Sequence, residues 1–379
     1  MHQQKIKIAI IAGEDSGDLL GADLIENLLT LNPNIEFIGV GGNKMEAAGL
    51  QLISANTEFA IMGFAEVISK LPKLLILRRR IIKEIIAAKP DLFIGIDAPD
   101  LNFPIGKKLK NQGIKIIHYV SPSIWAWRPK RAVKISKLTD LVLTLFPFEP
   151  KYYQEVGGTA LFVGHPMAQN IGLIIDKDQV KKSIGLDTGK PVLAVLPGSR
   201  SNELKAHTDI FLKTALKLKA HNSDLQIISA NTSRQKMQFI QESANRNNLE
   251  IKIIQDATTV LQASDLALLA SGTVALEAML CKTPMVVGYR ISAITYSIVK
   301  TFKMLLLPYY SLPNILYGGF LVPEVLQNNM TVDNLYQQLY PLLQPTEQTE
   351  LVNEFTRLHQ DLLSPDTSAA KAVMEFLKC

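Results

Sequence analysis

The sequence contains little cysteine and no long apolar run. Its 379 residues include only Cys281 and Cys379, too few for a disulfide framework or a zinc knuckle, so a reducing cytoplasm is expected. No stretch approaches the roughly 20 apolar residues of a transmembrane helix. The first apolar run ends at Gly13, which is too early for a signal peptide. The sequence therefore predicts a soluble or peripheral protein.

Several common motifs are also missing. The sequence has no GxGxxG fingerprint, no internal repeat, no low-complexity tract and no nucleic-acid motif, so nucleic acid is not expected as a partner. His, Cys, Asp and Glu are not spaced as metal ligands, and no metal or cofactor is predicted. Asp176 and Asp178 form a DxD in a lysine-flanked linker, where solvent exposure is expected. The net charge of +5 arises mainly in the first 165 residues and suggests an anionic surface or substrate there.

Short apolar runs alternate with helical stretches over a length that suits two domains. Strands are predicted over residues 7–12, 36–40, 91–96, 115–120, 140–145 and 160–163, then over 192–196, 226–230, 251–254, 266–270 and 285–289. Strands are expected to stop near residue 290, and residues 331–378 to be helical. This pattern predicts an α/β protein with two Rossmann-like β/α/β domains facing each other across a cleft and a helical C-terminus. The expected boundaries are 1–167, 168–345 and 346–379.

The second domain contains a candidate anion site. The expected strand 266–270 runs directly into Ser271-Gly272-Thr273 and then a helix, so unpaired N–H groups and the positive end of the helix dipole should face those residues. Glu277 lies one turn further on and can accept hydrogen bonds from a ribose diol. The alternative is a helix N-cap with an acid that complements the dipole.

A second turn in the same domain supports the nucleotide interpretation. Ser199 and Arg200 follow the expected strand 192–196 and precede a helix. An arginine at such a turn can bind a phosphate with two hydrogen bonds. The sequence therefore predicts that a nucleotide binds to the second domain.

The first domain contains two candidate catalytic acids. Asp97 follows the expected strand 91–96, and the carboxyl ends of parallel strands are where open α/β sheets bind ligands. It is a candidate general base, or else an aspartate bonding its own turn. Glu14 lies in the loop 13–18, whose acids would repel a pyrophosphate. It is expected to meet sugar hydroxyls, or to lie in a solvated loop that caps the next helix.

The loop 121–131 contains Trp125, Trp127 and Arg128, and both tryptophans of the chain fall in it. One interpretation is an aromatic and basic wall that faces an anionic, partly apolar acceptor. The other is a loop whose tryptophans fill the core.

The stretch 61–77 is more apolar than a helix buried on one stripe requires. A break is expected at Pro72, between Ile68 and Leu71 on one side and Leu74 and Leu75 on the other. A run of three arginines, 78–80, follows. An exposed apolar surface rimmed by cations would dock on an anionic membrane; the alternative is a buried helix pair.

Taken together, the motifs AGEDSGD (12–18), GIDAPDLN (95–102), HYVSPSIWAWR (118–128), LPGSR (196–200), LLASGTVALE (268–277), PMVVGYR (284–290) and SLPN (311–314) resemble those of lipid-A-disaccharide synthases of Gram-negative bacteria. The resemblance runs from about residue 5 to residue 378. It implies a GT-B glycosyltransferase without a metal cofactor. It places Asn314 and Glu14 beside Asp97 in the active cleft.

The implied reaction moves 2,3-diacylglucosamine from its UDP donor to the 6-hydroxyl of 2,3-diacylglucosamine 1-phosphate. The donor is α-linked and the product is the β-1′,6-linked disaccharide, so the anomeric configuration inverts, which requires one in-line attack and one base. Similar enzymes are cytoplasmic, associate with the inner membrane and can form homodimers. The alternatives are another UDP-sugar enzyme, such as the glucosaminyltransferase of peptidoglycan synthesis or a UDP-sugar 2-epimerase, and a non-catalytic nucleotide-binding membrane protein.

Overall fold

A computed structural model describes residues 5–60, 67–127, 130–291, 308–363 and 367–378. The side chains of residues 59–60, 67–73, 126–127 and 345–347 lie outside this description. The chain forms two compact units, Met1–Pro166 with Ser364–Cys379, and Met167–Leu363.

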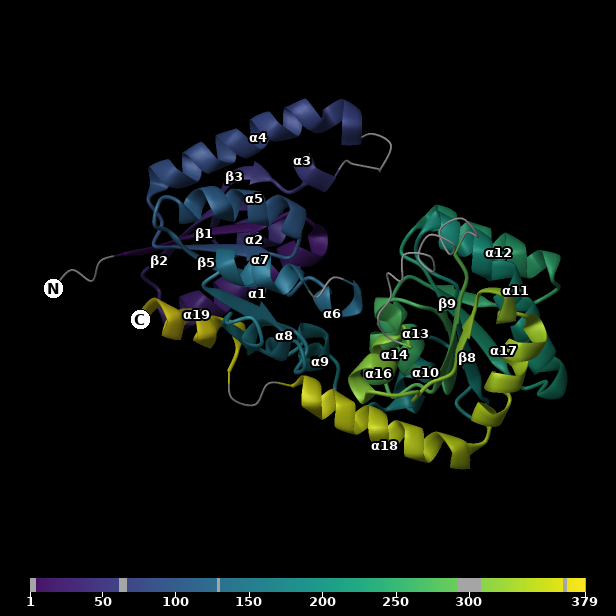
Figure 1. Ribbon diagram of the computed structural model, residues 1–379. Helices are drawn as coiled ribbons and strands as arrows, with labels where there is room; N and C mark the ends of the chain where they lie inside the picture. The colour runs from purple at the N-terminus through teal and green to yellow at the C-terminus, as the bar shows by residue number, and fades with distance from the viewer. Residues whose placement is uncertain (1–4, 61–66, 128–129, 292–307, 364–366, 379) are drawn as a thin grey trace. The chain divides into compact units, whose positions relative to one another are not determined.

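The first unit is built on a seven-stranded parallel sheet with the order β3-β2-β1-β4-β5-β6-β7 (Figure 1). Its strands are β1 (Ile6–Ala12), β2 (Ile35–Gly41), β3 (Leu50–Ala55), β4 (Leu92–Ile96), β5 (Lys115–Tyr119), β6 (Leu141–Thr144) and β7 (Ala160–Phe162). Its helices before residue 166 are α1 (Asp15–Leu31), α2 (Asn43–Ala47), α3 (Thr57–Ala60), α4 (Val67–Ala88), α5 (Pro99–Lys110), α6 (Ile124–Trp127), α7 (Arg131–Leu138) and α8 (Pro150–Gln154).

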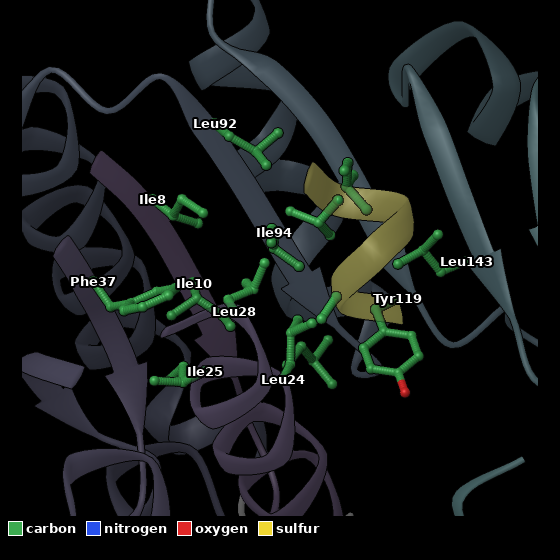
Figure 2. Packing of buried hydrophobic residues seen from close by; sticks show 14 of the residues in the cluster. Ile8, Ile10, Leu24, Ile25, Leu28, Phe37, Leu92, Ile94, Tyr119 and Leu143 are labelled. Atoms are coloured by element: carbon green, nitrogen blue, oxygen red, sulfur yellow. The ribbon is translucent and has the colours of Figure 1, made fainter. Parts of the chain in front are cut away.

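Helices cover both faces of this sheet because successive strand residues point to opposite sides. On β1, Ile8 and Ile10 join one apolar cluster, whereas Ala9 and Ile11 join another. Figure 2 shows the first cluster, in which Leu24 and Leu28 of α1 meet Ile8 and Ile10. The second cluster packs against α4 and α5. The strands are therefore almost continuously apolar.

The second unit repeats this arrangement with a six-stranded parallel sheet, in the order β10-β9-β8-β11-β12-β13. Its strands are β8 (Val192–Leu196), β9 (Gln226–Ala230), β10 (Lys252–Ile254), β11 (Leu266–Ala270), β12 (Met285–Tyr289) and β13 (Glu324–Leu326). The main helices are α9 (Pro166–Asn170, which begins at the unit boundary), α10 (Lys177–Ser183), α11 (Ser201–His221), α12 (Arg234–Arg246), α13 (Ala257–Gln262), α14 (Thr273–Leu280), α16 (Leu312–Tyr317), α17 (Val332–Leu339) and α18 (Pro345–Leu362). Two short 3-10 helices, Gln327–Asn329 and Pro341–Leu343, flank α17.

The chain then returns to the first unit. Its last helix, α19 (Ala369–Lys378), lies against α1 and buries Ala370, Ala372 and Val373 in the same cluster as Ile8 and Ile10. Figure 2 shows α19 in yellow beside Tyr119 and Leu143. The segment 346–379, expected as C-terminal helices that pack back on the domains or on a partner, is divided between the two units.

The structure corrects four local predictions. Strands do not stop near residue 290, because β13 pairs with β12. A third strand, β3, was not predicted. Helix α1 begins at Asp15, so most of the expected loop 13–18 is its first turn. Helix α4 runs from Val67 to Ala88 and does not break at Pro72.

Candidate active site

In each unit the strand order reverses at one point, and both sets of predicted site residues follow the strands that meet there. The reversal lies between β1 and β4 in the first sheet and between β8 and β11 in the second. Open α/β sheets bind ligands outside the carboxyl ends of the strands at such points. Glu14 and Asp97 follow β1 and β4, and Arg200 and Ser271 follow β8 and β11.

The second unit has a cavity of about 460 Å³ at this position. It is lined by the two loops that leave β8 and β11, together with residues that follow β9 and β10. All six predicted donor residues line it: Ser199, Arg200, Ser271, Gly272, Thr273 and Glu277. The structure therefore brings residues from two distant sequence motifs around one space.

One wall of this cavity has the properties of an anion site. Helix α14 begins at Thr273 with Gly272 as its N-cap, and the first amides of a helix have no intrahelical acceptor. Arg200 has a side chain that is 83% exposed, and its guanidinium lies 3.3 Å from Glu203. An ion pair with so exposed an arginine is weak, so the guanidinium is available to a phosphate.

Glu203, which was not predicted, shapes the loop that carries Arg200. Its carboxylate accepts hydrogen bonds from the backbone N–H groups of Ser199 (3.1 Å) and Arg200 (3.2 Å). Gly198 has a φ of +120°, and a Cβ there would lie 2.6 Å from Glu203. An acid at the third position of a helix is a known capping signal when Ser or Thr is the N-cap, but the N-cap here is Arg200, so the sequence lacks the usual pattern.

Glu277 lies one turn further along α14 and is less solvated. Its carboxylate is half-buried and accepts a hydrogen bond from the Thr258 hydroxyl. Burial raises the pKa of Glu277, and this effect outweighs the hydrogen bond from Thr258. A held, partly desolvated carboxylate is suited to accept hydrogen bonds from a diol.

In the first unit, Asp97 lies on strained backbone. Asp97 and Ala98 have φ values of 45° and 39°, and Val120 at the end of the neighbouring β5 has 77°. Non-glycine residues in this region cost energy and cluster at functional sites. The amide of the buried Asn102 donates to the carbonyls of Ile96 and Asp97, at 3.0 and 2.8 Å, and so holds the turn. Asp97 lines a cavity of about 500 Å³ in this unit.

Glu14 lies beside this turn. Its side chain is exposed and makes no capping hydrogen bond to α1. A Cβ on Gly13 would lie 3.3 Å from the Cβ of Ala98, so the segments after β1 and β4 are in contact. Asp18, in contrast, is buried and accepts hydrogen bonds from three backbone amides of the segment 42–45, which is a structural role.

Trp125 fills the core rather than forming a surface wall. It is 6% exposed, and its indole N–H donates to Glu149 at 3.1 Å. Glu149 is also buried and accepts from the backbone amides of Leu145 and Phe146. Burial raises the pKa of Glu149 to about 7. The side chain of Trp127 and the whole of Arg128 lie outside the described residues.

Asn314 has a structural environment. It is fully buried, donates to Val322 and Glu324, and accepts from the amides of Leu321 and Val322. These bonds use both its amide nitrogen and its oxygen to hold the segment 321–324 against α16.

Helix α4 has a partly exposed apolar end. Leu74 is half-buried, while Leu75 and Ile76 are 41% and 66% exposed, next to the exposed Arg79 and Arg80. Further along, Ile81 and Ile85 are buried against the sheet. The side chains of Ile68 and Leu71 lie outside the described residues. No helix in the described parts of the chain is long and apolar enough to cross a membrane.

No group of three or more His, Cys, Asp or Glu residues that would suit a metal occurs among the described residues. Asp176 of the DxD caps α10 by accepting from the amide of Gln179 at 2.9 Å.

Two Rossmann-like units, each with candidate site residues at its switch point, give the GT-B architecture. The family model for lipid-A-disaccharide synthetase matches residues 8–375. A lipid-A-disaccharide synthase of Xanthomonas campestris pv. campestris is 44% identical over 377 residues, covering 98% of this chain and 86% of the relative. That of Azotobacter vinelandii is 43% identical and covers 98% of both chains. The chain belongs to the lipid-A-disaccharide synthase family, and it is a glycosyltransferase that forms the lipid A disaccharide.

Solved structures support the fold alone. The UDP-GlcNAc 2-epimerase of Neisseria meningitidis, bound to UDP-GlcNAc, aligns with a TM-score of 0.61 at 13% identity, covering 99% of this chain and 100% of that one. The calicheamicin glycosyltransferase CalG4 aligns with a TM-score of 0.61 at 15% identity, covering 100% and 99%. Epimerases and transferases share this architecture, so the family match decides between them.

Proposed function

We propose that the second unit binds the UDP-2,3-diacylglucosamine donor in the cavity between the loops after β8 and β11. The observation that carries this proposal is the chemistry of the cavity lining. An exposed arginine and a helix N-terminus form a first wall, and the half-buried Glu277 lies one turn further along the same helix. A nucleotide sugar carries a diphosphate that suits the first wall and a ribose diol that can donate hydrogen bonds to the carboxylate. Related epimerases that bind UDP sugars share the fold.

The donor diphosphate becomes a leaving group, and the first wall is suited to stabilise it. Arg200 offers a planar pair of N–H donors, and the amides and hydroxyls of Ser271 and Thr273 lie at the positive end of α14. Such preorganised donors stabilise charge as it develops in the transition state. Glu277 orients the ribose, and the hydroxyl of Thr258 keeps the carboxylate in place.

In the first unit, Asp97 is the proposed base. Oxygen O6 of the acceptor attacks C1 of the donor sugar from the face opposite UDP, and the bond from C1 to the diphosphate oxygen breaks. The proton of the 6-hydroxyl passes to the Asp97 carboxylate, and UDP leaves. The anomeric centre therefore inverts in one displacement. The strained backbone at Asp97 supports this role, since strain of this kind persists only where the surrounding structure holds it.

Glu14 and Asn314 receive different roles. The exposed Glu14 carboxylate, next to the turn at Asp97, is proposed to accept hydrogen bonds from acceptor hydroxyls. Asn314 is proposed as a positioning residue, because its polar atoms hold the backbone of residues 321–324.

The exposed apolar end of α4 is proposed to dock on the cytoplasmic face of the inner membrane, where the diacylated acceptor resides. Leu75 and Ile76 would enter the headgroup region, and Arg79 and Arg80 would face anionic lipids. A homodimer is proposed from the resemblance, and sedimentation of the detergent-free protein measures it.

Mass spectrometry of the lipids formed from both substrates, with UDP release measured in parallel, tests this function. We expect the disaccharide 1-phosphate and an equimolar amount of UDP. UDP retention without a new lipid would favour a nucleotide-binding protein, and isomerisation of the donor sugar would favour an epimerase.

A further inference from the structure

A second cavity in the first unit adjoins the one that Asp97 lines. It occupies about 770 Å³ between α5 and α7. Arg131, the first residue of α7, lines both cavities. We call the second cavity the α5–α7 groove. Asp97 and Arg131 both line the first cavity, and Arg131 also lines the α5–α7 groove.

The α5–α7 groove is strongly basic. Of the ten described residues that line it, five are cations and none is an acid; the cations are Lys107, Lys110, Arg131, Lys134 and Lys137. Asp140 neutralises Lys110 at 3.1 Å. Lys107, Lys134 and Lys137 are exposed cations around the groove.

Arg131 is available to an anion. The carboxylate nearest to it, Asp100, lies 3.9 Å away and is fully exposed, whereas the Arg131 side chain is only 27% exposed. An exposed partner at the distance limit of an ion pair contributes little. The Arg131 guanidinium therefore lines both cavities, and Asp100 occupies little of its hydrogen-bonding capacity.

The interior of the groove is apolar. Phe103, Pro104, Ile135 and Leu138 line it, and Phe103 packs against the buried cluster that contains Ile135. Cations around an apolar floor match an amphiphile with an anionic head and a hydrocarbon chain.

We propose that Arg131 binds the phosphate of the sugar acceptor and that the α5–α7 groove receives an acyl chain; this subsite rests on the proposed function. The order of substituents on the acceptor carries the argument. The ring oxygen joins C1, which carries the phosphate, to C5, which carries the 6-hydroxymethyl group. The acylated positions 2 and 3 follow C1 around the ring, on the side away from C5. With the 6-hydroxyl at Asp97, the phosphate reaches Arg131, and the acyl groups lie beyond it over the groove.

The test compares Arg131→Gln with the wild-type enzyme on two acceptors, the 1-phosphate and the same diacylated sugar without phosphate. The wild-type enzyme should prefer the phosphorylated acceptor. Loss of a charged hydrogen bond corresponds to a fall of roughly 10- to 150-fold in kcat/KM. This fall should affect the phosphorylated acceptor alone, so the preference should disappear in the variant, while UDP affinity stays unchanged.

Lys108→Gln is the matched control, since Lys108 is an exposed cation on α5 that does not line the groove. It should keep the wild-type preference. Arg131→Lys retains the charge without the bidentate fork and should show a smaller loss, which serves if the glutamine variant does not fold. An undiminished preference in folded Arg131 variants, or no preference in the wild-type enzyme, would overturn the subsite. No disaccharide from the wild-type enzyme would instead overturn the proposed function.

Discussion

Replacing Arg200 by alanine should separate ligand affinity from stability. The side chain is 83% exposed, and within the described parts of the chain its guanidinium pairs with Glu203 at 3.3 Å. An ion pair with so exposed an arginine contributes about 0–1 kcal/mol. The melting temperature of the unliganded protein should therefore be nearly unchanged in Arg200→Ala.

The effect on UDP binding should be much larger. If the guanidinium binds a diphosphate oxygen, the lost charged hydrogen bond is worth about 1.5–3 kcal/mol, and UDP affinity should fall by roughly 10- to 150-fold. The thermal stabilisation that UDP confers on the wild-type protein should shrink accordingly, because it depends on the ratio of ligand concentration to Kd.

Calorimetric titration with UDP and thermal melts with and without UDP measure both quantities. Lys205→Ala is a suitable control, since Lys205 is an exposed cation on α11 that does not line the cavity. Glu203→Ala should behave differently from Arg200→Ala, because Glu203 holds two loop amides, so it should lower both UDP affinity and the melting temperature. Unchanged UDP affinity in Arg200→Ala would refute the assignment of the nucleotide to this wall.

Four further predictions concern catalysis, metal, membrane and pH. Asp97→Asn should reduce turnover roughly 10²- to 10⁴-fold with unchanged UDP affinity; near-normal turnover would exclude Asp97 as the base. Activity should persist in EDTA, because Arg200 and the α14 N-terminus are proposed to stabilise the diphosphate; a loss restored by Mg²⁺ or Mn²⁺ would contradict this. Replacing Leu75 and Ile76 together by serine should reduce co-sedimentation with anionic vesicles while leaving the fold intact, and a collapsed melting temperature would show that they are core residues. Glu149 has a pKa raised from 4.5 to about 7. As pH rises through this range, the folded protein therefore keeps the Glu149 proton while the unfolded chain has already lost it. Between pH 4.5 and 7 the wild-type protein should lose on the order of 3 kcal/mol of unfolding free energy relative to Glu149→Gln, and parallel urea-denaturation profiles would contradict the shift.

Much of the architecture was predictable because buried parallel strands are continuous apolar runs. The expected strands at 192–196 and 266–270 coincide with β8 and β11. The missed β13 has only three residues, Glu324–Leu326, and includes a glutamate. Its apolar signal is therefore too short to recognise, and its pairing with β12 is a tertiary property. The missed β3 ends against α3, where no glycine or proline marks the boundary.

The prediction at Pro72 failed for a different reason. Proline removes one hydrogen bond from a helix interior and usually kinks or ends it, yet Pro72 is the sixth residue of the 22-residue α4. The part of the helix after it buries Ile81 and Ile85 against the sheet. Most helix stability in proteins comes from such tertiary packing, which here outweighs a single helix-breaking residue.

Some site residues have roles that their sequence neighbours reveal, and others have roles that depend on residues distant in the sequence. Ser271, Gly272 and Thr273 were recognisable because a strand, a turn and a helix follow one another directly in the sequence. Glu203 was missed because it acts on a strained loop that lies beside it in space. Arg131 belonged to the basic loop that the sequence indicated, but its place in the walls of two cavities is a tertiary property. Trp125 is a residue that the sequence could suggest for the surface but that lies in the core. Its hydrogen bond to Glu149, 24 positions away, could not be read from the loop around it.

The return of α19 has a consequence for synthesis on the ribosome. The first unit contributes the first 166 residues to emerge, yet its core includes Ala370, Ala372 and Val373. Until those residues leave the exit tunnel, one side of α1 and the neighbouring strands has no cover. The whole second unit is made in the interval. A chain that ends at residue 363 and has been released from the ribosome should therefore carry a folded second unit and a first unit that still exposes apolar surface to chaperones.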